Sequence, residues 1–414
     1  RAGVDVVVVD HHLVPDEPLP ALAFLNPHRP DCGFAFKGLC SAGLCLSLGA
    51  ALRKRMGGNL DLRPWLDLVA LGTVADVAPL TGDNRALVRA GLRLLGGERA
   101  RPGVVALREL ARMKPGKVTS GDIAFRMAPR LNAAGRMGDP ALTLALLRAK
   151  TSGEAQQVAA AIEQLNQERK STEKAVTAEA LAQVEQVYGS SPGEAVVAVG
   201  DGWHRGVVGI VAARLVDRFG VPAVVLGFDD GAAGLPTDVA HGSGRAPGGG
   251  SVYDVVSAAA SLLETFGGHR AAVGLSVTRA QVDALRAAIS DRSRSITPPP
   301  ETDLLVDVTL DGVAFGVPKA ADLLRLEPVG EGNPDPLYLV EGAVVESVRT
   351  VGDGGSHLKL GVRLGRARLS AFGFDMADRA PTEGNPVSLV GHLRPDTWRG
   401  GDAVELHITS MPTL

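Results

Sequence analysis

The hydrophobic pattern near the amino terminus is a run of four valines, Val6–Val9, followed directly by Asp10, His11 and His12. Such a β-branched apolar run predicts a strand that is buried on both faces. The three polar residues then fall at the carboxyl end of the strand, which is the edge where open α/β sheets bind ligands. Carboxylate and neutral imidazole both donate to Mn, Zn or Fe, so the trio is a candidate divalent-metal site. A loop that simply begins with polar residues is the alternative.

Two helices and an apolar stretch are predicted within residues 42–95. Residues 42–55 carry leucines at helical spacing, and 84–95 form a further short helix. Between them, the apolar stretch 65–76 ends in Asp76, which has apolar neighbours on both sides. A carboxylate in such surroundings is costly unless a metal, an arginine or backbone donors contact it. A helix-capping role is the alternative for Asp76.

Basic residues gather in 130–136, after a helix that is predicted over 119–127. Arg130 and Arg136 flank Asn132 and several small residues. Small residues let the backbone approach an anion while guanidinium groups grip it, so this segment is a candidate phosphate site. A solvated surface loop is the alternative interpretation.

Residues 151–188 are rich in Ala, Glu, Gln and Lys, and they contain no proline. Thr151 and Glu154 fit a capping box, and a broken apolar stripe follows. A helix of about 35 residues would be about 50 Å long. We therefore expect a spacer between domains. A coiled-coil dimer competes with this view, but the apolar repeat lapses around 169–173.

A second α/β unit is predicted after this helix, with strands at 195–199 and 223–227 around a helix over 207–219. The glycine-containing loop between strand and helix places backbone N–H groups and His204 where an anion could bind. Ser243 and Arg245 lie further on, and His269 follows two glycines. These residues add two phosphate-compatible motifs, although a helix C-cap is the usual role of such glycines.

The last hundred residues, beyond Pro298–Pro300, alternate in short apolar stretches separated by Gly and Asp turns. This pattern predicts several β-strands and most economically a small OB-like barrel. Barrels of this kind bind single-stranded nucleic acid through stacked aromatic rings and basic residues. Core packing is the commoner role of aromatic residues on strands. The candidates are Phe372, Phe374, Trp398, Arg349, Lys359, Arg363 and Arg399.

Composition narrows the class of protein. The chain has 414 residues, 45% of them hydrophobic, and a net charge of −3, which argues against a wholly basic nucleic-acid-binding protein but permits a local basic groove. No apolar stretch approaches the ~20 residues of a membrane span, and no secretion signal is visible. The three cysteines lack metal-binding spacing, which favours free thiols in a reducing cytoplasm.

Because Arg1 leads almost at once into a strand that needs neighbouring strands to pair with, we expect upstream sequence to be missing.

The ordered set of motifs resembles the RecJ exonucleases of the DHH phosphoesterase superfamily. The segment 327–334 also resembles the connection to their OB-like domain. The motifs are Asp10-His11-His12, Gly72-Thr73-Val74-Ala75-Asp76, Arg130-Leu131-Asn132-Ala133-Ala134-Gly135-Arg136, Trp203-His204-Arg205-Gly206-Val207-Val208-Gly209-Ile210, Gly242-Ser243-Gly244-Arg245 and Gly267-Gly268-His269.

The resemblance covers nearly the whole chain and implies an α/β fold class in four regions. A parallel-sheet DHH catalytic domain would occupy 1–150 without its amino-terminal part, and a long connecting helix 151–190. A smaller α/β domain of the DHHA1 type would follow over 191–295, and an OB-like nucleic-acid-binding barrel over 301–414.

The activity that the resemblance implies is 5′-to-3′ degradation of single-stranded DNA to mononucleotides with two Mn²⁺ or Mg²⁺ ions, in DNA repair and recombination. Carried over by position, His11 is a metal ligand and Asp76 a ligand that bridges both ions. Asp10 orients the site, and His12 contacts the scissile phosphate. Two metals would generate hydroxide and stabilise the attacking and leaving oxygens.

The same resemblance assigns the phosphate contacts. Arg130 and Arg136, with Asn132 between them, would hold DNA on the catalytic domain. The second-domain groups that bind the terminal phosphate and nearby backbone would be His204, Ser243, Arg245 and His269. A single-stranded-DNA-binding protein and a RecQ-type helicase are the implied partners of a monomeric cytoplasmic enzyme that does not contact membranes.

Two departures from the family matter. Its aspartate-rich first motif and a further Asp would lie before Arg1, so only His11 and Asp76 clearly match ligand positions. Because each metal takes about four to six donors, we expect this chain alone to be inactive or severely impaired. Ala246 stands where the family commonly has Ser. Two other classes stay open: a phosphodiesterase of short oligonucleotides or cyclic dinucleotides, and a non-catalytic single-stranded-DNA-binding relative.

Overall fold

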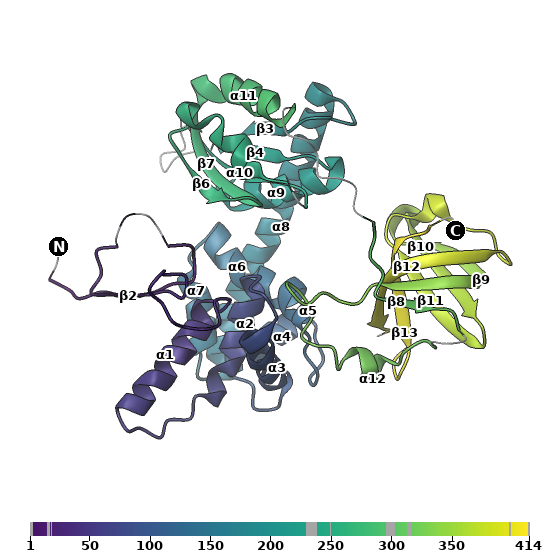
Figure 1. Cartoon of the computed structure of the whole chain (residues 1–414), viewed down its shortest axis with the longest axis horizontal. Helices are drawn as coiled ribbons and strands as arrows, with labels where there is room; N and C mark the ends of the chain where they lie inside the picture. Colours follow the sequence, from purple (N-terminus) through teal and green to yellow (C-terminus); the bar gives the residue numbers. More distant parts are fainter. Residues whose placement is uncertain are drawn as a thin grey trace. The chain divides into compact units, whose positions relative to one another are not determined.

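A computed structural model describes residues 3–14, 17, 19–228, 238–248, 250–294, 303–312, 316–396 and 399–412. These residues form two compact units (Figure 1). Unit 1 comprises 1–100, 114–128 and 303–414, and unit 2 comprises 101–113 and 129–302. Pro298–Pro300 and Trp398, which the sequence singled out, lie outside the described residues.

Unit 1 begins with two short parallel strands, β1 (Val7–Val9) and β2 (Ala23–Leu25). Among the described strands β1 pairs only with β2, and Val7 is 53% exposed. The prediction of a strand at this place is confirmed, but the prediction that it is buried on both faces is wrong. The physical reason is that the described residues supply one neighbouring strand and no second covering layer.

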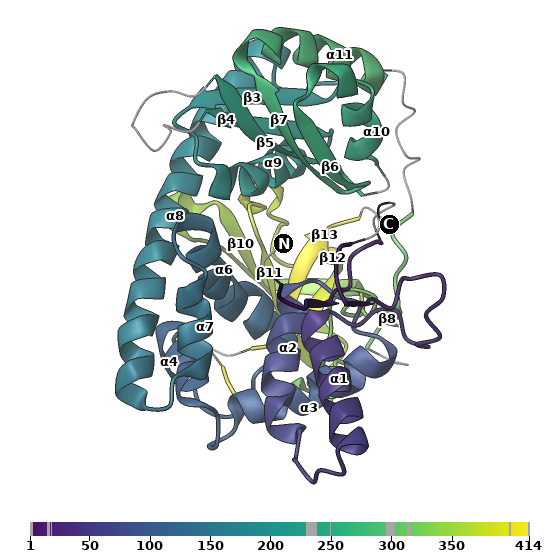
Figure 2. The ribbon, with the colours of Figure 1, turned by 90° about the vertical axis from the view of Figure 1, so that its left-hand side faces the viewer.

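Three helices follow in unit 1, α1 (Ser41–Arg55), α2 (Leu66–Ala75) and α3 (Gly82–Gly96). Helices α1 and α3 lie where the apolar spacing predicted them, whereas α2 occupies a stretch for which only apolar character was predicted. Helix α2 packs against both α1 and α3 (Figure 2). Gly91 allows the contact between α2 and α3, because a Cβ at this position would lie 2.2 Å from the carbonyl oxygen of Leu66. This contact lies at the start of α2, and Asp76 follows the other end of that helix.

A broken helix leads from unit 1 into unit 2. Thr119 caps α5 (Ser120–Asp122) through a capping box, a π-helical turn spans Ile123–Met127, and α6 covers Ala128–Met137. The segment 130–136 is therefore helical, and the surface-loop alternative is wrong.

Unit 2 is built along the long helix α8 (Ser152–Tyr188), which begins with the expected capping box at Thr151. It packs against α4 (Pro102–Leu110) and α7 (Ala141–Arg148) (Figure 2). Where the apolar stripe lapses, the buried Arg169 donates to Glu173 at 2.6 Å and to Asn166 at 3.2 Å. The helix is thus packed along its length rather than standing as a bare spacer.

The rest of unit 2 is a five-stranded mixed sheet with strand order β3-β4-β5-β7-β6. Only β3 and β4 are parallel, and α9 (Arg205–Phe219) connects them. Short helix α10 (Val252–Ser257) and α11 (Val282–Arg294) complete the domain. The strands are β3 (Val196–Asp201), β4 (Ala223–Phe228), β5 (Val239–Arg245), β6 (Thr265–His269) and β7 (Ala272–Thr278).

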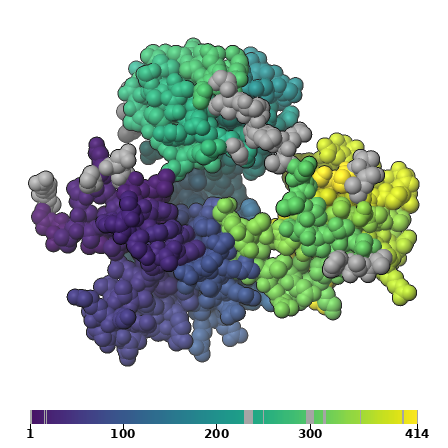
Figure 3. Space-filling view, in the orientation of Figure 1, coloured from purple at the N-terminus to yellow at the C-terminus, as the bar shows by residue number. Residues whose placement is uncertain are grey.

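The carboxyl-terminal part of unit 1 is a closed barrel, in which the pairings run β9-β10-β11-β13-β12 and back to β9. The space-filling view shows this part of the chain in green to yellow (Figure 3). Its core is aliphatic, with Leu358, Leu406 and Leu389 fully buried. The strands are β8 (Val308–Leu310), β9 (Tyr338–Val351), β10 (His357–Leu364), β11 (Ala367–Gly373), β12 (Pro386–Pro395) and β13 (Val404–Ser410), and α12 (Ala320–Leu323) precedes β9.

Within the described part of the chain, no helix is both long enough and apolar enough to cross a bilayer. The cysteines at 32, 40 and 45 are all free thiols, as expected from their spacing.

Candidate metal centre and phosphate-binding surfaces

Asp10 organises the end of β1. Its Oδ1 accepts hydrogen bonds from the backbone N–H groups of His11 at 2.8 Å and His12 at 3.3 Å, and it lies 2.7 Å from His12 Nδ1. Burial acts to raise the pKa of Asp10, but the hydrogen bonds from the His12 ring and from both backbone groups outweigh it and hold that pKa below its ordinary value. The carboxylate is therefore ionised and fixes the turn that carries both histidines.

His11 joins β1 to the helices behind it. Its Nε2 lies 2.8 Å from Asp76 Oδ2, and its Nδ1 lies 2.9 Å from Ser41 Oγ at the start of α1. Because Nδ1 is engaged by a hydroxyl, Nε2 is the nitrogen that faces Asp76, as in metal-binding histidines whose other ring nitrogen is held by an oxygen. Ser41 was not predicted as a site residue. No local signal in the sequence marks it.

Asp76 follows the last residue of α2, where its N–H donates to the Gly72 carbonyl at 3.0 Å. A helix carboxyl terminus favours a cation and disfavours a carboxylate. Asp76 is therefore the C-cap residue of α2 and not an N-cap. Its side chain is 41% exposed and contacts His11, which is not among the partners that the sequence led us to expect, a metal, an arginine or backbone donors.

His12 is the most exposed of the three motif residues, with 69% of its side chain accessible. Its ring lies 4.3 Å from that of His11, centroid to centroid, and its carbonyl oxygen accepts a 2.8 Å hydrogen bond from the buried Asn26. Asn26, on the turn after β2, thus holds the second histidine in place and is another residue that the sequence did not reveal.

The donor atoms of this cluster fit a divalent cation. One ligand atom from each of Asp10, His11 and His12 can be chosen so that all lie within 4.8 Å of one another, and Asp76 Oδ2 adds a second carboxylate beside His11. Mixed imidazole and carboxylate donors suit Mn²⁺, whereas Mg²⁺ is held mostly by oxygen. We call these four residues the DHH cluster.

The three predicted residues of α6 have different surroundings. Arg130 is largely buried, pairs with Glu163 at 2.7 Å and donates to the Leu110 carbonyl at 3.2 Å, so it ties α6 to α8 and α4. Asn132 is exposed. Arg136 donates to the Gly206 carbonyl at 3.1 Å, and partial removal from water, followed by repulsion from Arg169, lowers its pKa.

The start of α9 and strand β5 form one anion-compatible corner in unit 2. His204 is the N-cap of α9, where its Nδ1 accepts a 3.0 Å hydrogen bond from the Gly206 N–H. Arg245 donates to Ser243 Oγ at 2.7 Å, and a Cβ at Gly209 would lie 3.0 Å from the Arg245 Nη2. Burial lowers the pKa of Arg245, and repulsion from the Arg136 guanidinium lowers it further. The two guanidinium groups are therefore close enough to repel each other, and an anion bound between them would stabilise both.

His269 ends β6 and is exposed. His269 of β6 and Arg245 of β5 both pair with Ala272 of the intervening strand β7. The three residues therefore lie in one row on the same face of the sheet. Gly268 lies within β6 at φ 148°, where a Cβ would clash with the Ala272 carbonyl. The helix C-cap alternative for these glycines is therefore wrong, because Gly267 and Gly268 both lie within strand β6, next to His269.

An outward-facing row crosses the barrel. The register aligns Lys359, Phe372, His407 and His392 on the adjacent strands β10, β11, β13 and β12. Phe374, just beyond β11, is 66% exposed and stacks on the His357 ring at 4.4 Å. Aromatic and basic side chains thus gather on the outer surface of the strands rather than in the core.

The basic residues proposed for the barrel differ in their pairing. Lys359, Arg363 and Arg399 each pair with an acidic side chain, whereas Arg349 is exposed on β9. The outer surface of the barrel therefore carries less net positive charge than these basic side chains alone indicate.

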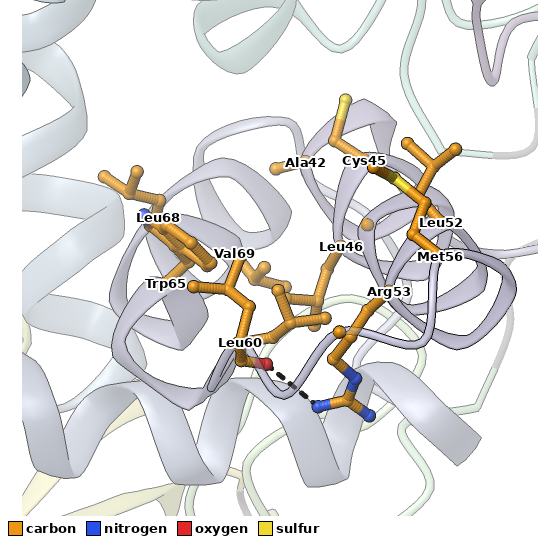
Figure 4. A pocket seen from close by; sticks show the side chains of 13 residues that line it. Ala42, Cys45, Leu46, Leu52, Arg53, Met56, Leu60, Trp65, Leu68 and Val69 are labelled. Carbon is orange, nitrogen blue, oxygen red and sulfur yellow. Dashed lines mark hydrogen bonds between the residues drawn. The ribbon is translucent and has the colours of Figure 1, made fainter.

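An apolar cavity of about 610 Å³ lies between α1 and α2 (Figure 4). Cys45 and Leu52 of α1 line it together with Met56, the C-cap of that helix, and Trp65 and Val69 line it from the opposite side. Arg53 is the one charged residue that lines it, and it donates to the Leu60 carbonyl at 3.1 Å. The cavity contains no carboxylate or imidazole, so it is separate from the chemistry of the DHH cluster.

The fold and these sites define a protein of the DHH/DHHA1 architecture with a carboxyl-terminal OB-type barrel. The DHHA1 domain family matches residues 193–294, and the RecJ OB domain family matches 306–410. A single-stranded-DNA-specific exonuclease RecJ from Salmonella typhimurium is 35% identical over 98% of this chain and 73% of its own length. The chain belongs to the RecJ single-stranded-DNA-specific exonuclease family.

Further relatives agree with this assignment. The RecJ of Bacillus subtilis is 34% identical over 98% of this chain, and this chain spans 50% of that protein. The solved structure of RecJ in complex with Mn²⁺ from Thermus thermophilus superposes with a TM-score of 0.80 at 30% identity, covering 100% of this chain and 59% of that one. The chain thus spans about half to three quarters of the length of these relatives.

Proposed function

We propose that this protein is a single-stranded-DNA-specific 5′-to-3′ exonuclease that releases mononucleotides by metal-dependent phosphodiester hydrolysis, in DNA repair and recombination. The observation that carries the proposal is the 2.8 Å contact between His11 Nε2 and Asp76 Oδ2 beside Asp10 and His12. The imidazole of His11 and the carboxylate of Asp76 come from distant parts of the chain and meet at one point. A loop that merely begins with polar residues does not bring such groups together. Related proteins named single-stranded-DNA-specific exonucleases support the substrate class.

The metals proposed are Mn²⁺ or Mg²⁺, the ions present in solved RecJ structures. His11 and Asp76 would hold the metal, with Ser41 fixing the His11 tautomer. Asp10 orients the histidine turn through its three hydrogen bonds, one of them to His12 Nδ1. The His12 ring, 69% exposed, would contact a phosphate oxygen. When bound, paired metals would supply a hydroxide nucleophile and stabilise charge on the reacting oxygens.

Strand binding is proposed for the corner of Arg136, His204, Ser243 and Arg245, with His269 on the same face. A 5′-phosphate brings negative charge to two guanidinium groups that otherwise repel each other, so its binding would relieve that repulsion. Arg130 is engaged by Glu163, and we propose that it positions α6 while Asn132 and Arg136 face the DNA.

The barrel row would contact bases further along the strand. Phe374 is the strongest candidate, because its ring is exposed and already stacked on His357, and stacking tolerates any base sequence. A phosphodiesterase of short oligonucleotides would not need this surface. A non-catalytic relative would not need the DHH cluster, which is retained. The single-stranded-DNA-binding protein, the RecQ-type helicase and the monomeric state remain predictions.

The deciding assay is Mn²⁺-dependent release of nucleotides from 5′-labelled single-stranded DNA. We would compare this chain with a version extended upstream by the segment that the longer relatives carry. Because the four residues of the DHH cluster offer fewer donors than two metals need, we expect only the extended protein to release mononucleotides. Hydrolysis of dinucleotides or cyclic dinucleotides, with long DNA left intact by both forms, would replace this proposal with the small-substrate alternative.

A further inference from the structure

The segment Glu327–Asn333, here called the strap, precedes the barrel and packs against the turn that follows Asp76. The Leu80 N–H of that turn donates to the Glu331 carbonyl at 2.6 Å. Arg85, one helical turn into α3, donates to the carbonyls of Leu326 at 2.8 Å and Pro328 at 3.1 Å. Residues far apart in the sequence are thereby joined close to the proposed metal ligand, within unit 1.

A second set of contacts fixes the other end of the strap. Ser120 is only 1% exposed, and its N–H donates to Glu327 Oε2 at 3.0 Å. Its hydroxyl has two acceptors for one hydrogen, Glu327 Oε2 at 2.8 Å and the Val329 carbonyl at 2.6 Å. The Val329 N–H in turn donates to Ser120 Oγ at 3.1 Å. The strap is therefore held at Ser120 by the Val329 backbone and by one side chain, that of Glu327. Hydrogen bonds to a carboxylate are stronger than neutral ones, so Glu327 is the side chain whose removal should loosen this end of the strap most.

The turn that the strap holds is strained. After α2 the Val77 N–H donates to the Val74 carbonyl and the Ala78 N–H to the Thr73 carbonyl, which is a Schellman motif. Val77 occupies its left-handed position at φ 56°, where glycine is usual and a β-branched residue is disfavoured. Such a conformation persists only when surrounding contacts enforce it.

Further contacts enclose the same turn. The fully buried Asn84 donates to the carbonyls of Gly38 at 2.6 Å and Pro79 at 2.9 Å. A Cβ at Gly332 of the strap would lie 3.2 Å from Pro79 and 3.3 Å from Thr81. Pro79 is therefore enclosed by Gly38, Asn84 and the strap, which leaves the turn little freedom.

We propose that the strap is a positioning element for Asp76, and that Glu327 is its principal positioning residue. Glu327 holds Ser120, the strap then presents the Glu331 carbonyl to Leu80, and the fixed turn keeps the Asp76 carboxylate against His11. The proposal rests on the proposed metal site. Its consequence is that the connection leading into the barrel determines the geometry of a metal ligand.

The test compares Glu327→Ala with Glu331→Ala. Both remove one carboxylate from the same strap, but Glu331 contributes its backbone carbonyl to Leu80, which the substitution leaves in place. Mn²⁺ affinity is measured on this chain by titration, and kcat and KM for single-stranded DNA on the upstream-extended protein. We expect Glu327→Ala to lower Mn²⁺ affinity and kcat about tenfold or more with KM within about twofold, and Glu331→Ala to change neither.

Two further measurements separate positioning from simple folding. Glu327→Gln, which still offers an oxygen to Ser120, should restore most of the Mn²⁺ affinity, and hydrogen exchange at the Leu80 amide should accelerate in Glu327→Ala alone. If Glu327→Ala does not fold, Ser120→Ala replaces it. Equal Mn²⁺ affinity in the two alanine variants would overturn the strap proposal and leave the exonuclease proposal standing. Absence of Mn²⁺ binding and DNA cleavage in the unsubstituted proteins would overturn both.

Discussion

His11 and Asp76 meet with 2.8 Å between Nε2 and Oδ2, although one follows strand β1 and the other ends helix α2. The contact depends on three supports: Ser41 on the far side of the imidazole, the hydrogen-bonded Asp10 turn, and the strained turn after Asp76. A cation placed between the two donors would also lie at the carboxyl terminus of α2, where the helix dipole favours positive charge. The metal prediction below follows from this geometry.

Replacing Asp76 with Asn should lower Mn²⁺ affinity more than about 100-fold. Loss of a residue that only supports a metal ligand typically lowers affinity about 10- to 100-fold, and loss of a ligand should cost more. The amide keeps the size of the side chain but removes the negative charge, so folding should be little affected. Mn²⁺ titration followed by electron paramagnetic resonance measures the effect. The same substitution at the exposed Asp217 of α9 is the control, and equal affinities in the two variants would count against Asp76 as a ligand.

Gly209→Ala should weaken binding of 5′-phosphorylated single-stranded DNA about tenfold, through loss of about one charge-assisted hydrogen bond. The new Cβ would lie 3.0 Å from Arg245 Nη2 and 3.2 Å from Ser243 Oγ, so the guanidinium must move. Gly153→Ala, in the first turn of α8, has open space around its Cβ and serves as the control. Fluorescence anisotropy with phosphorylated and unphosphorylated DNA checks this. An equal loss for both DNAs would show that the corner does not recognise the terminal phosphate.

Much of the secondary structure follows from local patterns. The leucine spacing of α1, the capping box of α8 and the alternation in β9 to β13 each depend on residues close in sequence, and these elements lie where they were predicted. The burial of β1 was mispredicted because burial depends on which layers cover a strand, which the strand's own residues do not encode. Gly267 and Gly268 were ambiguous for a similar reason: only pairing with β7 makes them a strand.

The candidate site was predictable only in part. Asp10, His11, His12 and Asp76 could be selected by residue type and by position after apolar segments, and the structure brings them together. Ser41 could not be found, since one serine at a helix start resembles many others. The role of Glu327 could not be predicted from the sequence either, because its partner Ser120 is adjacent to it only in the folded chain.

Val77→Gly should raise the free energy of unfolding by about 1 kcal/mol, because glycine adopts a left-handed conformation without the Cβ clash. Val77 is 67% exposed, so little buried apolar contact is lost. Val187 in α8 is also exposed, and Val187→Gly there should cost roughly 0.4 kcal/mol instead. Urea denaturation of both variants gives the comparison. A decrease in stability at both positions would show that the Val77 turn is not strained.

The barrel should lose stability as the pH falls below about 6.5, the ordinary pKa of histidine. Burial lowers the pKa of His407; Glu405 acts in the opposite sense, and Arg394, Lys359 and His392 lower it further. The folded state then binds the proton less readily than the unfolded state, so stability is complete above about 6.5 and decreases as the pH falls from there through the lowered pKa. Thermal denaturation between pH 5 and 8 measures the slope, which His407→Gln should reduce because glutamine does not titrate. If the slope is the same in His407→Gln, other groups cause the pH dependence and the assignment to His407 is wrong.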